Sequence, residues 1–260
     1  MTVRVSQVVT FAAEPFRGNP AYVVRLARDA PPALLGSLAG QFGQDVVAFL
    51  GPQDGDAVRL RFATAAGPHP GAGHAATAAA AVLLEDLTSI EVAFEDGTRR
   101  RFSREGDRIV VPWPAMAYVA CELRQELGAA LGQVPEQCLV APFGYVAIYT
   151  DEAALRRMAP DMAALARLDR NAVIVTAPGI ESDVAVRVFA PKVGLPEDPV
   201  CGTAHRIIVP YWSERLSRKQ LHSRHLSPRG GDLWCEVDGA TVAIAGQTYR
   251  FLDGELSLPD

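Results

Sequence analysis

The hydrophobic residues of this chain are spaced in two ways, at every second position in some segments, as in strands, and about every 3.6 positions in others, as in helices. Residues 3–10 and 21–26 are short runs rich in β-branched side chains, which predicts two strands, and the Gly18-Asn19-Pro20 turn between them predicts a hairpin-like opening. Pro31-Pro32 precedes leucines spaced for one helical face, which predicts a helix through Phe42. Further strands are predicted at residues 46–50, 58–63, 90–94, 99–103 and 108–111. An alanine-rich helix is predicted at residues 73–85.

The second half repeats these parts. Helices are predicted at residues 122–131 and 202–216, with Pro210 expected to kink or shorten the second. Strands are predicted at residues 145–149, 172–176, 183–189, 232–237, 241–245 and 247–252. Both halves therefore mix strands and helices, and the predicted class is α+β.

One motif occurs twice. Phe62-Ala63-Thr64 leads through a Gly/Pro-rich turn to Ala72-Gly73-His74, and Phe189-Ala190-Pro191 leads to Cys201-Gly202-Thr203-Ala204. The repetition predicts two pseudo-symmetric lobes whose Gly-helix ends face each other across a cleft. Prolines flank Trp113, so the predicted N-terminal lobe is 1–115, joined by strand 247–260, and the C-terminal lobe is 116–246.

Composition removes several function classes. The net charge of -5 gives no basic stripe, so nucleic acid is not expected as a partner. The longest apolar run, Ala75 to Leu84, is about half of the ~20 residues that span a bilayer, so no membrane partner is expected. The N-terminus lacks a signal-peptide layout, which predicts a cytoplasmic protein. The four cysteines form no CxxC pair, and free thiols are expected.

Gly73 and Gly202 stand at the predicted helix starts. Backbone N–H groups at a helix N-terminus lack intrahelical acceptors, and glycine lets a ligand approach them closely. Two such ends would bind a small carboxylate and stabilise negative charge that develops beside it. The alternative is that both are ordinary tight turns with capped helices.

Three side chains near these glycines are candidates for moving protons. His74 titrates near neutral pH, although it would serve equally as a cap or a core histidine. Asp198 is a catalytic acid or a helix cap. Cys201, at a helix N-terminus, is expected to have a lowered pKa and to act as a base, or else to be a buried small hydrophobe.

No cofactor or metal is expected. His222 and His225 lie close in sequence, but no Cys, Asp or Glu beside them completes a ligand set. Gly71-Ala72-Gly73 lacks the third glycine of a dinucleotide-binding motif. These patterns favour cofactor-free proton transfer.

The chain resembles the phenazine-biosynthesis isomerase (PhzF-like) family, whose fold is that of diaminopimelate epimerase. The resemblance rests on residues 16–20, 72–74, 197–205, 227–231 and 253–256. It implies two lobes, each a curved sheet wrapped around a central helix, a homodimer, and isomerisation of a small carboxylate-bearing metabolite without cofactor. It also implies that Asn19 and Thr203, together with the two glycines, contact that substrate.

The sequence departs from the family at one position. The family's acid/base glutamate is expected three residues before a Phe-hydrophobe pair, and here that position is Val46, with Asp45 beside it. Three interpretations are open: Asp45 replaces the glutamate, Cys201 is the base, or the parent chemistry is lost. With Asp45 or Cys201 as the base, a lyase (dehydratase) or cyclase is the alternative to an isomerase, and the third interpretation favours a cyclisation driven by positioning or a non-catalytic ligand-binding dimer.

Overall fold

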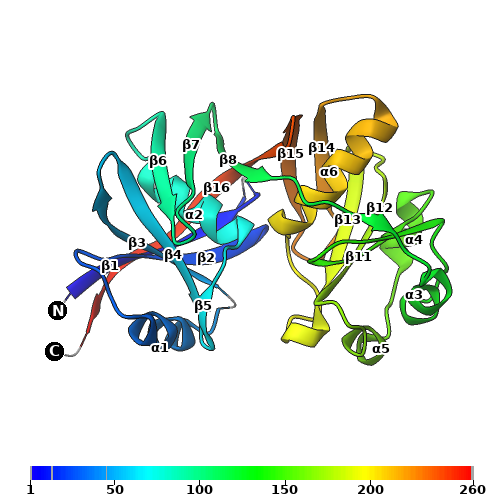
Figure 1. Cartoon of the computed structure of the whole chain (residues 1–260), viewed down its shortest axis with the longest axis horizontal. Helices are drawn as coiled ribbons and strands as arrows, with labels where there is room; N and C mark the ends of the chain where they lie inside the picture. Colours follow the sequence, from blue (N-terminus) through cyan, green and yellow to red (C-terminus); the bar gives the residue numbers. More distant parts are fainter. Residues whose placement is uncertain (1, 13, 45, 259–260) are drawn as a thin grey trace. The chain divides into compact units, whose positions relative to one another are not determined.

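The structure is a computed structural model and describes residues 2–12, 14–44 and 46–258 (Figure 1). Its helices are α1 (Pro32–Phe42), α2 (Gly73–Leu83), α3 (Arg124–Leu131), α4 (Glu152–Arg157), α5 (Met162–Ala166) and α6 (Gly202–Leu216), with a 3-10 turn η1 (Pro191–Val193). No helix among the described residues is long and apolar enough to cross a bilayer.

The chain divides into two compact units. Unit 1 comprises Met1–Pro112 and Ala245–Asp260, and unit 2 comprises Trp113–Ile244. The boundaries fall close to the predicted ones at residues 115 and 247.

Unit 1 contains one sheet whose strand order closes on itself. The order is β1-β2-β3-β4-β6-β7-β8-β16, and β16 also pairs with β1. The strands are β1 (Thr2–Thr10), β2 (Asn19–Arg25), β3 (Val47–Asp54), β4 (Ala57–Thr64), β5 (Gly67–His69), β6 (Ser89–Phe94), β7 (Arg99–Glu105), β8 (Arg108–Pro114) and β16 (Thr241–Ser257). The short β5 pairs only with β4.

Unit 2 continues with the order β16-β15-β14-β13-β12-β11-β10-β9. The strands are β9 (Val119–Ala120), β10 (Gln137–Val140), β11 (Gly144–Ile148), β12 (Ala172–Pro178), β13 (Val184–Phe189), β14 (Gln220–His225) and β15 (Gly231–Asp238). Only the first residues of β16 belong to this unit. The sequence predicts two strands, 241–245 and 247–252, where the structure has the single strand β16, which continues through Gly246. A Cβ at Gly246 would lie 2.5 Å from Phe11 Cδ1, so the close packing of Phe11 on the strand requires glycine there.

The pairing pattern confirms the predicted duplication. In unit 1, β2–β3 and β4–β6 are the parallel pairs, and the connections between their strands carry α1 and α2. In unit 2, β11–β12 and β13–β14 are the parallel pairs, with α4, α5 and α6 in their connections. Parallel neighbours need such helical crossovers, so the same α+β unit is built twice.

Helix α2 is the centre of unit 1. It packs against β1, β2 and β3, and Figure 1 shows it among these strands. Nine of its eleven residues are buried, as expected for a helix that is apolar on all sides. Two arginines satisfy carbonyls at its C-terminal end, because Arg25 donates to Val82 O at 2.8 Å and Arg104 donates to Leu84 O at 3.1 Å.

Helix α6 has the corresponding place in unit 2, where it packs against β14 and β15. The expectation that Pro210 shortens it is wrong, since the helix runs on to Leu216. A proline removes the N–H that would bond the carbonyl four residues earlier. Here that carbonyl, Arg206 O, accepts the backbone N–H of Met116 at 2.8 Å, which offsets the loss.

Candidate functional site

The candidate site in unit 1 is the N-terminus of α2. The helix begins at Gly73, after Ala72 in an extended conformation, as the sequence predicts. The turn before it is held by His69, whose Nδ1 accepts the N–H of Gly71 at 3.2 Å. His74 follows Gly73 directly and its side chain is half-buried.

The imidazole of His74 is neutral in this environment. Burial lowers its pKa to about 4, and the nearby charge of His69 acts in the same direction. A neutral imidazole can accept a proton at one nitrogen and donate one at the other. His69 is the last residue of β5 and lies close enough to His74 to act on its charge.

Asn19 also lies in unit 1. It begins β2, its side chain is buried, and its carbonyl accepts the hydroxyl of Thr10 at 3.0 Å. The preceding Gly18 has φ +65°, and a Cβ there would lie 2.2 Å from Thr10 O. The tight Gly18-Asn19 turn therefore requires glycine and fixes where Asn19 enters the sheet.

The candidate site in unit 2 is the N-terminus of α6. This helix begins at Gly202, and Cys201 precedes it in an extended conformation. Asp198 does not cap the helix: its Oδ1 accepts the N–H of Val200 at 3.1 Å and so stabilises the preceding turn. Thr203 lies in the first helical turn with its side chain half-exposed.

The predicted lowering of the Cys201 pKa is wrong. Its side chain is 4 % exposed, and burial is the largest of the effects that raise the pKa of the thiol well above its usual value. The charge of Asp198 raises it further, and the N–H groups of Thr203 and Ala204 only partly oppose this. The helix N-terminus is thus outweighed by desolvation and a neighbouring carboxylate. Cys201 is a thiol that hydrogen-bonds with Asp198.

Two buried histidines hold the backbone of Cys201. His225, the last residue of β14, accepts the N–H of Cys201 at Nε2, at 3.3 Å. His205, one turn into α6, donates from Nδ1 to the carbonyl of Cys201 at 2.9 Å and accepts the hydroxyl of Ser223 at Nε2, at 2.8 Å. Burial lowers the pKa of His205 to about 4 and that of His225 well below its usual value. Both rings are therefore neutral, and for His225 the bond that it accepts at Nε2 requires this.

The loop between β14 and β15 supports the same turn. Ser227 donates its hydroxyl to the carbonyl of Pro199 at 2.6 Å and accepts the N–H of Gly230 at 3.1 Å. The segment is a hairpin loop, since β14 and β15 are antiparallel. Its contact with the turn before α6 joins residues 28 positions apart and had no signal in the sequence.

A buried ion pair anchors the start of that turn. Arg187 on β13 binds Glu197 through two hydrogen bonds, at 2.8 and 3.0 Å. The same guanidinium donates to the carbonyls of Leu155 and Met158, both at 2.8 Å, and lies over the ring of Phe189. Glu197 thus has a structural partner and is not available as a free proton carrier.

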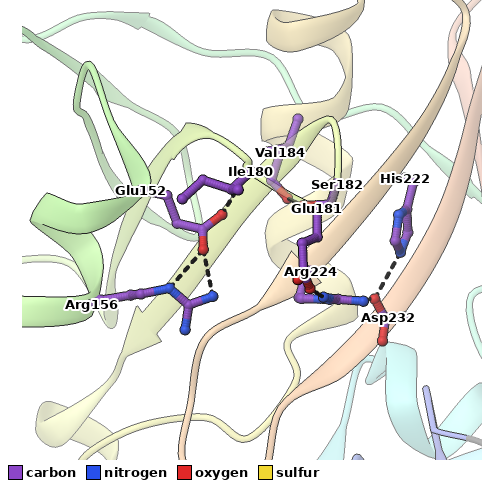
Figure 2. A network of polar contacts seen from close by, with 9 residues as sticks. All are labelled: Glu152, Arg156, Ile180, Glu181, Ser182, Val184, His222, Arg224 and Asp232. Atoms are coloured by element: carbon purple, nitrogen blue, oxygen red, sulfur yellow. Dashed lines mark hydrogen bonds and ion pairs between the residues drawn. The ribbon is translucent and has the colours of Figure 1, made fainter.

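A separate polar network lies on β13, β14 and β15 and the loop before β13 (Figure 2). His222 donates to Asp232 at 2.7 Å, and the same carboxylate oxygen accepts Nε of Arg224 at 2.9 Å. Arg224 also binds Glu181. The sequence has no acidic residue next to His222, but the fold brings Asp232, ten positions away, into contact with it. No predicted site residue belongs to this network.

The buried carboxylate of Glu152 stabilises the neighbouring loop. It accepts the N–H of Ile180 at 2.7 Å and pairs with Arg156 (Figure 2). Among the described residues, no group of three or more His, Cys, Asp or Glu side chains is placed to hold a metal ion.

The position of the missing glutamate is apolar and enclosed. Val46 is 7 % exposed and lies directly before β3. Its side chain carries no titratable group, so it cannot replace a carboxylate. The alternative base, Asp45, lies outside the described residues.

Comparison with known proteins agrees with this arrangement. Residues 8–108 and 115–254 match the PhzC-PhzF family, described as "Phenazine biosynthesis-like protein". The chain belongs to this family. An uncharacterized isomerase of Pseudomonas aeruginosa is 37 % identical over 99 % of this chain and 100 % of its own length. An uncharacterized isomerase of Halalkalibacterium halodurans is 31 % identical, again over 99 % and 100 %.

Solved structures give the same family and fold. A PhzF family protein of Enterococcus faecalis has a TM-score of 0.93 at 32 % identity, covering 99 % of this chain and 100 % of that one. A hydroxyproline epimerase of Agrobacterium vitis, covering 98 % and 91 %, has a TM-score of 0.63 at 13 % identity and shares the fold alone. The predicted epimerase-like α+β fold is thereby confirmed.

Proposed function

We propose that this PhzF family member is a cofactor-independent isomerase that transfers protons on a small carboxylate-bearing metabolite of secondary metabolism. The neutral imidazole of His74, in the first turn of α2, carries the proposal. It stands beside Gly73, where the helix N-terminus favours a bound carboxylate. Isomerases of the same family at 37 % and 34 % identity support the reaction type.

In this proposal His74 and Asp198 carry protons, and Cys201 does not act as a base. Asp198 is a carboxylate that is only partly exposed and interacts with the Cys201 thiol. The thiol donates to the carboxylate and orients it. Asn19, Gly73, Gly202 and Thr203 are the proposed substrate contacts.

A lyase or cyclase reaction is the second candidate, and the buried Val46 favours it. Two-sided proton exchange needs two groups, and the position of one is apolar here. Asp45 would then act as the base in place of the family's glutamate. A homodimer is proposed as well, on the family resemblance.

Solvent hydrogen exchange tests these proposals. The protein is incubated in deuterated water with the amino-dihydroaromatic acid of the parent family and with a panel of small carboxylic acids, and recovered compounds are analysed by NMR and mass spectrometry. Deuterium at a carbon position with rearrangement indicates isomerisation, and loss of water or ring closure indicates the second candidate. A compound that binds but neither exchanges nor changes would leave only the ligand-binding function.

Two variants then assign the base. Asp45→Asn removes the alternative carboxylate, and Cys201→Ala removes the thiol. The proposal expects exchange to persist in Cys201→Ala at a reduced rate, because Asp198 loses its donor. Complete loss in Cys201→Ala, with the fold intact by circular dichroism, would instead make the cysteine the base.

A further inference from the structure

The cysteines of unit 2 are not all isolated from one another. Cys121 and Cys138 are 17 positions apart, so the sequence indicates no pairing. In the sheet, Ala120 is opposite Leu139 and Val119 is opposite Val140. One further step along this antiparallel register places Cys121 opposite Cys138, and the N–H of Cys121 donates to the carbonyl of Cys138 at 2.9 Å.

This register places the two sulfur atoms within reach of each other. Directly opposed residues of a hydrogen-bonded antiparallel pair have Cα atoms about 5.5 Å apart, which is close to the most common separation in disulfides. The two thiols already interact as a side-chain hydrogen bond. No shift of the backbone register is needed to join them.

The two thiols differ in access to solvent. Cys138 is buried at 4 % exposure, whereas Cys121 is partly exposed directly after the edge strand β9. The sulfur of Cys121 accepts the N–H of Leu123 at 3.4 Å. Burial raises the pKa of Cys138, which keeps its proton. Cys121 is thus the residue that an oxidant in solution meets first.

We propose that Cys121 and Cys138 form a reversible disulfide when the protein meets hydrogen peroxide. The Cys121 thiolate attacks one peroxide oxygen, the O–O bond breaks, and hydroxide leaves, so that Cys121 becomes a sulfenic acid. The Cys138 sulfur attacks the Cys121 sulfur, its proton leaves with the sulfenic oxygen as water, and the S–S bond forms. In sum, two thiols are oxidised and one peroxide is reduced to two waters.

The disulfide would covalently link the edge strand of the unit 2 sheet to its neighbour. It closes a loop over residues 121–138, which includes α3, and fixes the two-residue strand β9 on β10. A cross-link of this kind restricts the unfolded chain. The oxidised protein is therefore more resistant to unfolding than the reduced protein. This proposal does not depend on the proposed isomerase activity.

Mass spectrometry of the native full-length protein tests the disulfide. After treatment with a small excess of hydrogen peroxide and alkylation in denaturant, titratable thiols fall from four to two. The intact mass before alkylation falls by about 2 Da, for the two hydrogens removed. A protease digest contains one cross-linked peptide pair, with Cys121 joined to Cys138, and dithiothreitol reverses both changes.

Variants separate the two roles. Cys138→Ser leaves the first step intact, so Cys121 accumulates as a sulfenic acid, adds about 16 Da and reacts with dimedone. Cys121→Ser forms neither product. Cys235→Ala is the matched control, since that cysteine is buried on β15 in the same unit, and it forms the disulfide like the wild type.

Several results would overturn the proposal. They are four free thiols after peroxide treatment, a disulfide that involves Cys201 or Cys235, and cross-linking that is as fast in urea as in the native protein. A urea midpoint that does not rise on oxidation would remove the stabilising role while leaving the disulfide itself.

Discussion

The N-termini of α2 and α6 come from one duplicated motif, yet their surroundings differ. The turn before α2 is held by one imidazole, His69, on the N–H of Gly71. Before α6, His225 and His205 bind both backbone polar groups of Cys201, and Ser227 binds Pro199. In unit 1, His74 lies next to the helix start and is not used to hold the turn, whereas in unit 2 both His205 and His225 hold the turn.

The histidines of the two turns also differ in their exposure to solvent. His74 is half-buried beside Gly73, whereas His205 and His225 are at most 1 % exposed. In unit 2 the proposed proton carrier is a carboxylate, Asp198, placed by the supported turn. Under the proposed function the two units therefore differ in the acid/base group at their central helix ends.

The largest expected effect is on catalysis. His74→Leu and Asp198→Asn each remove a proposed proton carrier and should lower the deuterium exchange rate roughly 100-fold to 10,000-fold. The rate is measured by NMR with the substrate found in the screen, at saturating concentration. His222→Asn, in the polar network of Figure 2, is the matched histidine control and should keep the rate. A normal rate in His74→Leu would contradict the role of unit 1.

The anchoring of the α6 turn is tested by Arg187→Met. The change leaves the largely buried Glu197 without its ion-pair partner and two carbonyls without a donor, so the free energy of unfolding should fall by roughly 3–5 kcal/mol. Urea unfolding measures it. The control is Arg101→Met in unit 1, where an exposed arginine pairs with Glu91 and the loss should stay within about 1 kcal/mol.

The buried histidines should make unfolding depend on pH. Burial lowers the pKa of His205 to about 4, so the unfolded chain, with a pKa near 6.5, binds a proton that the folded chain does not. Its contribution is present above about pH 6.5 and is lost as the pH falls to about 4, a change of about 3 kcal/mol. Comparing wild type with His205→Gln isolates it. Parallel stability curves for the two proteins would show that His205 does not supply this dependence.

The smallest expected effect comes from His225→Leu. It removes the acceptor for the N–H of Cys201 and should cost roughly 1–3 kcal/mol of stability. His225→Gln retains a side-chain acceptor and should recover part of the loss. The equivalent change in unit 1, His69→Leu, removes the acceptor for Gly71 in a less buried turn and should cost less. Equal losses at the two sites would contradict the difference between the turns.

Much of the local structure is readable from the chain. The bounds of α1 and α6 and the starts of both central helices agree with the prediction, since proline at the first turn and glycine at the helix start are strong local signals. Strands β5, β9, β10 and β14 are missing from the prediction. β9 has only two residues, β5 has three, and β14 contains one hydrophobic residue, Leu221, among polar side chains that include two histidines. Pairing with neighbouring strands, and not local composition, makes them strands.

The sequence by itself determined the duplication, the two glycine helix starts, the family, and the valine at position 46, where the resemblance implies a glutamate. These follow from short motifs whose physical meaning is local. Only the tertiary structure decided the state of the side chains at those motifs. Cys201 is a protonated thiol because burial and Asp198 outweigh the helix end, and Cys121 meets Cys138 because an antiparallel register places them opposite each other. Desolvation and strand pairing depend on residues distant in the chain, so no local pattern encodes them.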